Sequence, residues 1–231
     1  MHDPLLRRAF SVMALTPAFV TILFRVDGRG TAWLSHLSPG DPLDVLGPLG
    51  TPWNTEQLNA NSQVILVGGG VGVPPLVMLA KQVSRETPEV KLTAIIGART
   101  ASGLIGLNEL EASGVHVHVA TEDGSSGHAG RVTDVLTHLL PDDGATAPPR
   151  AELFACGPLP MLRAVALMAG ARSVPCQVSL EENMPCGIGV CNGCVVATSP
   201  GATQTDYERY SRICVHGPVM QGDAVDWEVT C

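Results

Sequence analysis

The residues with the clearest chemical potential are four cysteines near the carboxyl end of the chain. Within CGIGVCNGC and the later RICVHGP they follow the spacing C-x4-C-x2-C-x19-C. This is the spacing of plant-type [2Fe–2S] sites, in which four thiolates hold two irons. The sequence therefore predicts an iron–sulfur cluster, and its predicted ligands are Cys186, Cys191, Cys194 and Cys214.

The glycines between these cysteines fit the same interpretation, because Gly187, Gly189 and Gly193 let the chain wrap closely around inorganic sulfides. A structural zinc site with four cysteine ligands is the alternative. Zinc ribbons usually pair two C-x2-C knuckles, and this segment has one, so the spacing favours the cluster. Cys176 and Cys231 have no partner at a suitable spacing, and we interpret them as a buried small residue and an incidental terminal one.

A second chemical signal is the glycine-rich stretch VILVGGGVGVPP at residues 64–75. Glycines let the backbone approach a pyrophosphate, and the N-terminus of the following helix favours its negative charge. The alternative is a tight structural turn, because the glycines do not match G-x-G-x-x-G neatly. The predicted nucleotide contacts are Gly68, Gly69, Gly70 and Gly72.

Three shorter motifs add weaker signals. FACGPLPM ends a later strand, so Cys156, Gly157 and Pro158 are expected at the carboxyl end of the sheet, near a nicotinamide. RRAFS and GRGT, at residues 7–11 and 28–31, could hold the two ends of a flavin pyrophosphate. The alternatives are a buried cysteine before a helix, a surface arginine and an ordinary helix cap.

The elements that must position these residues divide into three regions. Strand and helix signals alternate between residues 62 and 170, which predicts βαβ units and a parallel sheet. Strands are expected at 63–70, 92–99, 115–124 and 151–158, and helices at 74–85, 104–113, 132–140 and 159–169. The predicted fold class is α/β plus β: a partial FAD-binding β-barrel (1–58), a parallel-sheet nucleotide-binding domain (59–172) and a small C-terminal [2Fe–2S] domain (173–231).

The composition narrows the function classes. With 231 residues, 45% of them hydrophobic and 16% charged, the chain can build a substantial core. A formal net charge of -8 argues against nucleic acid as a partner. The uncharged stretch 64–80 is broken by glycines and prolines, and MHDPLLRRAF lacks signal-peptide order, so no membrane association and a cytoplasmic location are expected.

The order of the motifs carries a family resemblance. RRAFS, GRGT, GDPLDVLGPLG, GGGVGVPP, ACGPLPM, SLEENMPCGIGVCNGC and CVHGPV follow one another along nearly the whole chain. This order resembles the ferredoxin–NADP reductase superfamily. Within it, the chain most closely resembles the electron-transfer subunits of the two-subunit, NAD-dependent dihydroorotate dehydrogenases, with the cluster segment 179–194 as the most specific part.

The resemblance implies cofactors and roles. The glycine loop and the Cys156–Pro158 turn would bind NAD, and the four cysteines would ligate the cluster. A catalytic flavoprotein subunit, in a heterotetramer, would oxidise dihydroorotate and send electrons through the cluster and FAD to NAD+, so no catalytic acid or base is expected here. The implied FAD contacts are Arg8, Phe10, Ser11, Leu23, Phe24, Arg25, Gly30 and Thr31.

Two departures and two rival functions accompany this resemblance. Family members begin with further barrel strands, whereas this chain starts almost at RRAFS, so either the chain is a fragment, its start is misassigned or the barrel is incomplete; Ala9 also stands where the family often has proline. Arg99 and Thr100 follow the second strand of the nucleotide domain without a second basic neighbour, which favours NAD over NADP. The rivals are a related reductase subunit serving another flavoprotein, and a non-catalytic metal-binding module that has lost FAD.

Overall fold

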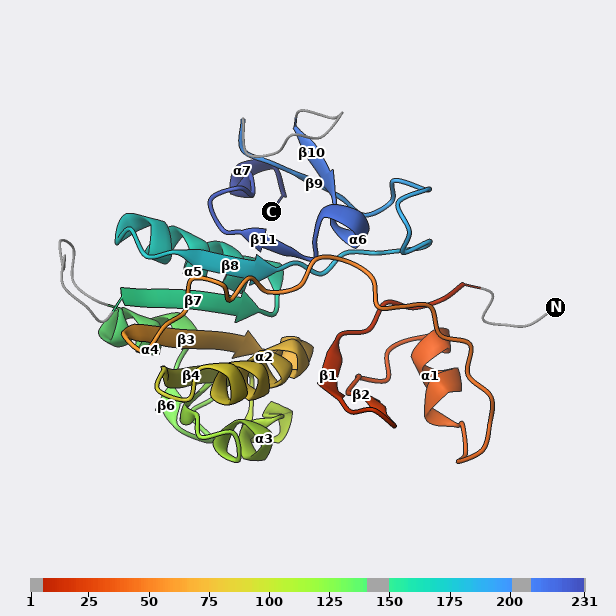
Figure 1. Cartoon of the computed structure of the whole chain (residues 1–231), viewed down its shortest axis with the longest axis horizontal. Helices are drawn as coiled ribbons and strands as arrows, with labels where there is room; N and C mark the ends of the chain where they lie inside the picture. The colour runs from red at the N-terminus through yellow and green to blue at the C-terminus, as the bar shows by residue number, and fades with distance from the viewer. Residues whose placement is uncertain (1–5, 141–149, 201–208, 231) are drawn as a thin grey trace.

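The centre of the molecule is a seven-stranded, mostly parallel sheet (Figure 1). The structure is a computed structural model that describes residues 6–140, 150–200 and 209–230. The strand order is β11-β8-β7-β3-β4-β5-β6; β11 pairs antiparallel with β8, and the other neighbours are parallel. The strands are β3 (Ser62–Gly69), β4 (Lys91–Ala98), β5 (His116–Thr121), β6 (His128–Ala129), β7 (Arg150–Cys156), β8 (Cys176–Ser179) and β11 (Val219–Gln221).

Helices cover both faces of this sheet, as alternation along β3 requires. Ile65 and Val67 pack into the core with α4 and α5, whereas Val64 and Leu66 pack with α2 and α3. All four side chains are fully buried. The helices are α2 (Val73–Glu86), α3 (Leu107–Glu111), α4 (Val132–Leu139) and α5 (Leu159–Ala171).

The predicted alternation of strands and helices in this region is confirmed. The helix expected at 104–113 is shorter, because Gly106 adopts a left-handed φ of 72° and the helix begins only after it. β8 and β11 lie within the region assigned to the cluster, and both belong to the central sheet. The prediction for Cys231 lies outside the described residues.

The N-terminal segment forms a separate antiparallel hairpin of β1 (Val12–Leu15) and β2 (Val20–Ile22), followed by α1 (Arg29–Ser35). Met13 on β1 is buried in the α2 core, and Leu23 packs against the same core. Figure 1 shows that the carboxyl ends of β3, β7 and β8 point toward this segment.

The C-terminal segment is joined to the main core. It contains the antiparallel pair β9 (Val195–Ala197) and β10 (Tyr210–Arg212), then α6 (Ile213–His216) and α7 (Trp227–Thr230). Ile213, Val225 and Trp227 are buried in the core that also holds α5 residues. Two short 3-10 turns, Gly70–Gly72 and Ala101–Gly103, complete the elements. Among the helices of the described ranges, none combines the length and apolar character needed to span a bilayer.

Candidate functional site

The glycine loop and the Cys156–Pro158 turn lie directly against each other. β3 and β7 are parallel neighbours, with Gly68 opposite Cys156 at their carboxyl ends. A Cβ atom on Gly72 would overlap the carbonyl oxygen of Cys156 and lie 2.5 Å from the backbone nitrogen of Gly157. A Cβ on Gly69 would lie 2.9 Å from the sulfur of Met161. Glycine is therefore required here by close packing between the two predicted nucleotide-binding segments.

Gly70 has a different reason to be glycine. Its φ is 54°, and no heavy atom lies within 4 Å of the position that a Cβ would take. The loop thus turns sharply at Gly70 with open space beside it, and then enters the 14-residue helix α2. A glycine turn that leads into a helix N-terminus presents backbone N–H groups to an anion, which is the geometry a pyrophosphate needs.

The thiol of Cys156 is buried at this junction. Burial, together with the nearby charge of Glu181, raises its pKa to about 12, although a hydrogen bond with Ser179 opposes the shift. Ser179 is the register partner of Cys156 on β8. The thiol therefore remains protonated and uncharged at neutral pH.

Glu181 links the carboxyl ends of the sheet to the N-terminal segment. Its side chain keeps access to solvent, yet partial desolvation raises the pKa of the carboxyl group, while the charge of Arg25 lowers it. Arg25 also forms an exposed ion pair with Asp27 at 3.4 Å. Sequence reasoning did not single out Glu181, although it stands in the SLEE stretch directly before the cluster loop.

The predicted FAD residues are brought together in two small groups. The guanidinium of Arg8 covers the start of α1, because a Cβ on Gly30 would lie 2.5 Å from its Nε. The rings of Phe10 and Phe24 are tilted, with centroids 5.6 Å apart. The hydroxyl of Thr31 is already used locally, since it accepts a 2.7 Å hydrogen bond from the backbone N–H of Asp27.

Two further members of the predicted FAD set differ in their contacts. Leu23 contributes to the core beside α2, and so ties this segment to the nucleotide-binding half. Ser11, directly before β1, is exposed. The predicted FAD residues therefore lie on the segment that faces the glycine loop and the Cys156–Pro158 turn (Figure 1).

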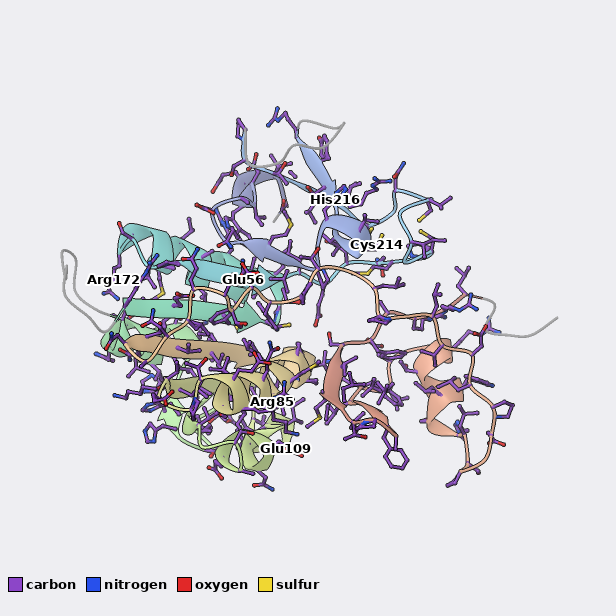
Figure 2. The ribbon with its side chains drawn as sticks, viewed as in Figure 1. Glu56, Arg85, Glu109, Arg172, Cys214 and His216 are labelled. Carbon is purple, nitrogen blue, oxygen red and sulfur yellow. The ribbon has the colours of Figure 1, made fainter. Side chains whose placement is uncertain are left out.

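Two of the four predicted cluster ligands belong to the folded core. Cys194 and Cys214 are buried. The β9–β10 ladder joins them, because Arg212 pairs with Val195 and the backbone N–H of Ile213 donates to the carbonyl of Cys194 at 3.1 Å. Burial, with the neighbouring thiol of Cys194, raises the pKa of Cys214 to about 11, while the N–H of Gly189 lowers it. In Figure 2, Cys214 lies on α6 beside the cluster loop.

The other two predicted ligands lie on an outer loop. Backbone N–H groups of Cys191, Ile188 and Val190, and the Cys191 thiol, lower the pKa of Cys186 to about 6. The N–H of Gly193 donates to the sulfur of Cys191 at 3.4 Å. The loop achieves this through three left-handed residues, whose φ angles are 70°, 79° and 55°: Gly187, Gly189 and Asn192.

The stronger thiol–thiol interactions join Cys186 with Cys191 and Cys194 with Cys214, and the charge of Cys186 also acts on Cys214. Over the described ranges, no set of three or more His, Cys, Asp or Glu side chains is close enough to hold one metal ion. A [2Fe–2S] cluster takes two thiolates per iron, and N–H groups that donate to sulfur stabilise the thiolate form. The donor set and the surrounding N–H groups therefore fit such a cluster.

Two family models match separate parts of the chain. Residues 181–226 match the model of the iron–sulfur cluster binding domain of dihydroorotate dehydrogenase B. Residues 66–166 match that of the oxidoreductase NAD-binding domain. The two matches cover the cluster loop and the glycine loop respectively.

The match to curated relatives extends over nearly the whole chain. The electron transfer subunit of dihydroorotate dehydrogenase B (NAD(+)) from Geobacillus kaustophilus is 43% identical over 226 residues, which are 96% of this chain and 81% of that protein. The chain belongs to the family of dihydroorotate dehydrogenase B electron transfer subunits. The subunit of the same name from Listeria monocytogenes serotype 4b is 37% identical over 96% of this chain and 82% of that protein.

Solved structures support the fold of this electron-transfer-subunit family. A chain from the structure of an NADH-dependent reduced ferredoxin–NADP oxidoreductase, described for flavin-based electron bifurcation, is 33% identical with a TM-score of 0.81. That match covers all of this chain and 78% of the other. The ferredoxin reductase of carbazole 1,9a-dioxygenase, at 22% identity and a TM-score of 0.57 over 73% of this chain and 52% of the other, shares the fold.

Besides Glu181, sequence reasoning missed a second functional candidate, Arg212. Arg212 lies two residues before Cys214 and donates to the carbonyl of Gly189 at 2.7 Å. A basic residue close to a predicted ligand cysteine is a signal in the sequence, but its contact joins positions 23 residues apart. Only the folded loop reveals that pairing.

Proposed function

We propose that this chain relays electrons from a dihydroorotate-oxidising flavoprotein partner, through a [2Fe–2S] cluster and FAD, to NAD+ in pyrimidine biosynthesis. One observation carries the proposal: a loop rich in N–H donors brings Cys186 and Cys191 near the core-bound Cys194 and Cys214, on the same chain as a glycine loop packed against the Cys156–Pro158 turn. Membership of the dihydroorotate dehydrogenase B electron-transfer family supports it.

We assign the cofactors to three groups of residues. Cys186 and Cys191 would hold one iron, and Cys194 and Cys214 the other, because the stronger thiol–thiol interactions join those pairs. The glycine loop, residues 68–72, and the Cys156–Pro158 turn would hold NAD. The residues assigned to FAD are Arg8, Phe10, Ser11, Leu23, Phe24, Arg25, Gly30 and Thr31.

When bound, these groups supply the redox chemistry: the cluster carries single electrons, the flavin one or two, and NAD+ accepts hydride. The protein supplies binding, orientation and electrostatics. Arg8 over the start of α1 offers a guanidinium to a phosphate. The buried thiol of Cys156 offers an uncharged surface where the sheet ends. No acid or base for the pyrimidine is assigned to this chain.

The partner in this proposal is a catalytic dihydroorotate dehydrogenase flavoprotein subunit, with a heterotetramer as the expected assembly. Ile188 and Val190 are exposed on the cluster loop, at 51% and 75%, which suits a contact that brings a second redox centre close. A cytoplasmic location is part of the same proposal, and fractionation of the native host tests it.

The decisive experiment is reconstitution with the partner. The isolated chain, loaded with FAD and cluster, should oxidise NADH with ferricyanide but should not oxidise dihydroorotate. Addition of the partner flavoprotein should produce dihydroorotate-dependent reduction of NAD+. Full dihydroorotate activity from the isolated chain, or none from the reconstituted complex, would contradict the proposal.

A second candidate is a related reductase subunit that serves another flavoprotein. The 33% identical chain from the NADH-dependent reduced ferredoxin–NADP oxidoreductase structure supports it. The partner that co-purifies with the native chain separates the two candidates. Capture of a dihydroorotate dehydrogenase supports the first, and capture of a different flavoprotein supports the second.

A further inference from the structure

Arg212 ties the two halves of the cluster site together. It ends β10, opposite Val195, and so lies on the ladder that joins Cys194 to Cys214. Its Nη1 donates to the carbonyl oxygen of Gly189 at 2.7 Å. The side chain therefore reaches from the core-bound half of the site to the outer loop that carries the other two cysteines.

Gly189 is the point where this contact acts on the ligands. While its carbonyl accepts from Arg212, its N–H donates to the thiol of Cys214. Its φ is 79°, and a Cβ there would lie 2.6 Å from Val215 and 3.4 Å from Nη1 of Arg212. One peptide segment thus connects a fixed cation to a ligand sulfur, in a position that tolerates only glycine.

The guanidinium has one donor to spare. Nε of Arg212 is buried and has no hydrogen-bond partner among the described residues. An unpaired buried donor on a cation is costly unless an acceptor or an anion completes its surroundings. A cluster held by four thiolates is an anion, and it gains a further negative charge on reduction.

We propose that Arg212 is a positioning residue that raises the reduction potential of the cluster. It does so in two ways: it holds the Gly189 peptide so that its N–H faces the Cys214 sulfur, and it places a partly buried positive charge beside the loop. Both effects favour the reduced, more negative cluster, because hydrogen bonds to sulfur and net local charge set cluster potentials. This inference rests on the proposed cluster.

The test is a redox titration of the full chain, loaded anaerobically with cluster and followed by the electron paramagnetic resonance signal of the reduced form. Arg212→Met removes the charge and the donor, and should lower the equilibrium preference for the reduced cluster at least tenfold, which is about 59 mV for one electron. Arg212→Lys keeps the charge and should shift the potential less. The matched control is Arg209→Met, which removes an arginine that pairs with Asp226 at 3.7 Å, and it should leave the potential unchanged.

Each outcome of the titration supports or overturns the inference. An unchanged potential in a fully loaded Arg212→Met protein overturns the inference, as does an equal shift in Arg209→Met. If Arg212→Met fails to retain the cluster, Arg212→Gln carries the measurement, since glutamine keeps a donor without the charge; a wild-type potential in that variant overturns the inference. A wild-type chain that assembles no cluster signal would overturn the proposed function together with it.

Discussion

The two candidate sites reach their geometry by different means. At the glycine loop, the backbone is fixed by close packing: Gly72 lies against the carbonyl of Cys156, where the mostly buried parallel strands β3 and β7 end. At the cluster loop, residues 186–193 form no strand or helix, and left-handed residues and N–H groups that donate to sulfur set the path. The nucleotide site is thus formed by the core, whereas the cluster site combines a core-bound pair of cysteines with a loop-borne pair.

This difference indicates where each site is vulnerable. At the ends of the sheet strands, an added methyl group meets backbone that cannot move, so a substitution there should lower both stability and nucleotide binding. In the outer loop, side chains can be replaced with little loss of apolar burial, so a substitution there should weaken binding of the cluster rather than lower stability. The following predictions test that division, beginning with the largest expected effect.

Replacing any of the four predicted ligands with serine should abolish the cluster, because a hydroxyl is a poor substitute for a thiolate. Wild-type absorbance, iron and acid-labile sulfide should all be lost after anaerobic reconstitution. The comparison becomes sharper within the set: Cys194→Ser and Cys214→Ser should also lower the melting temperature of cluster-free protein, because both residues are buried in the core. Cys186→Ser and Cys191→Ser should not.

Cys176 provides the control for this series. It is a buried cysteine on β8, where burial and the charge of Asp223 raise its pKa to about 12. Cys176→Ser should retain the cluster spectrum. Bound zinc without iron or sulfide in the wild-type chain, or loss of the cluster in Cys176→Ser, would show that the ligand assignment is wrong.

The second prediction concerns Gly72. A Cβ at this position overlaps the backbone of β7, so Gly72→Ala should cost about 1–3 kcal/mol of stability. At about 2–4 °C per kcal/mol for a chain of this size, thermal unfolding should detect the change, and titration should show weaker binding of NADH. Gly170→Ala is the control: nothing lies within 4 Å of its Cβ, and alanine should stabilise α5 by about 0.5–1 kcal/mol. Equal melting temperatures for both variants would contradict the packing argument.

The third prediction concerns the exposed tip of the cluster loop. Val190→Asp should cut dihydroorotate-dependent reduction of NAD+ in the reconstituted complex by about tenfold, since a charge in a buried interface costs about 1–2 kcal/mol. NADH oxidation with ferricyanide should be retained, because the backbone N–H at this position remains and the side chain faces solvent. Val229→Asp is the control, at 58% exposure on α7 against 75% for Val190. Unimpaired coupling in Val190→Asp would remove this loop from the partner interface.

The sequence predicted the parallel sheet and its helices because hydrophobic runs, glycine turns and helix periodicity are local signals. It also placed Gly68 and Cys156 in the same site, since carboxyl ends of parallel strands meet. The membership of β8 and β11 in the sheet was harder to foresee, because each is four residues or fewer and their pairing is set by tertiary contacts. The hydrogen bond from Arg212 to Gly189 and the electrostatic effect of Arg25 on Glu181 join distant segments, so no local sequence pattern predicts them.

The last prediction, with the smallest expected effect, concerns Glu181, which links the carboxyl ends of the sheet to the N-terminal segment. Partial desolvation raises the pKa of this carboxyl group in the folded chain above its ordinary value of 4.5, although Arg25 opposes the shift. The folded state therefore binds the proton more tightly than the unfolded state, and folding stability falls as the pH rises through the raised pKa. Glu181→Gln removes that dependence, so the stability of the variant relative to the wild type should rise from acid toward neutral pH. Because the side chain keeps access to solvent, we expect a gain of only a few tenths of a kcal/mol.

Glu86 provides a control of opposite sign. Hydrogen bonds from Gln82 and Arg85 lower the pKa of its carboxyl group below 4.5, so its contribution to stability is present above that pH and is lost on acidification. Glu86→Gln should therefore lose stability relative to the wild type as the pH rises toward neutrality, where Glu181→Gln gains. Thermal unfolding of the three proteins between about pH 3 and pH 7, in one series of buffers, measures both slopes, because the pKa of Glu86 lies below 4.5 and that of Glu181 above it. If the stability of both variants relative to the wild type changes in the same direction with pH, then Glu181 is not desolvated at the junction between the sheet and the N-terminal segment.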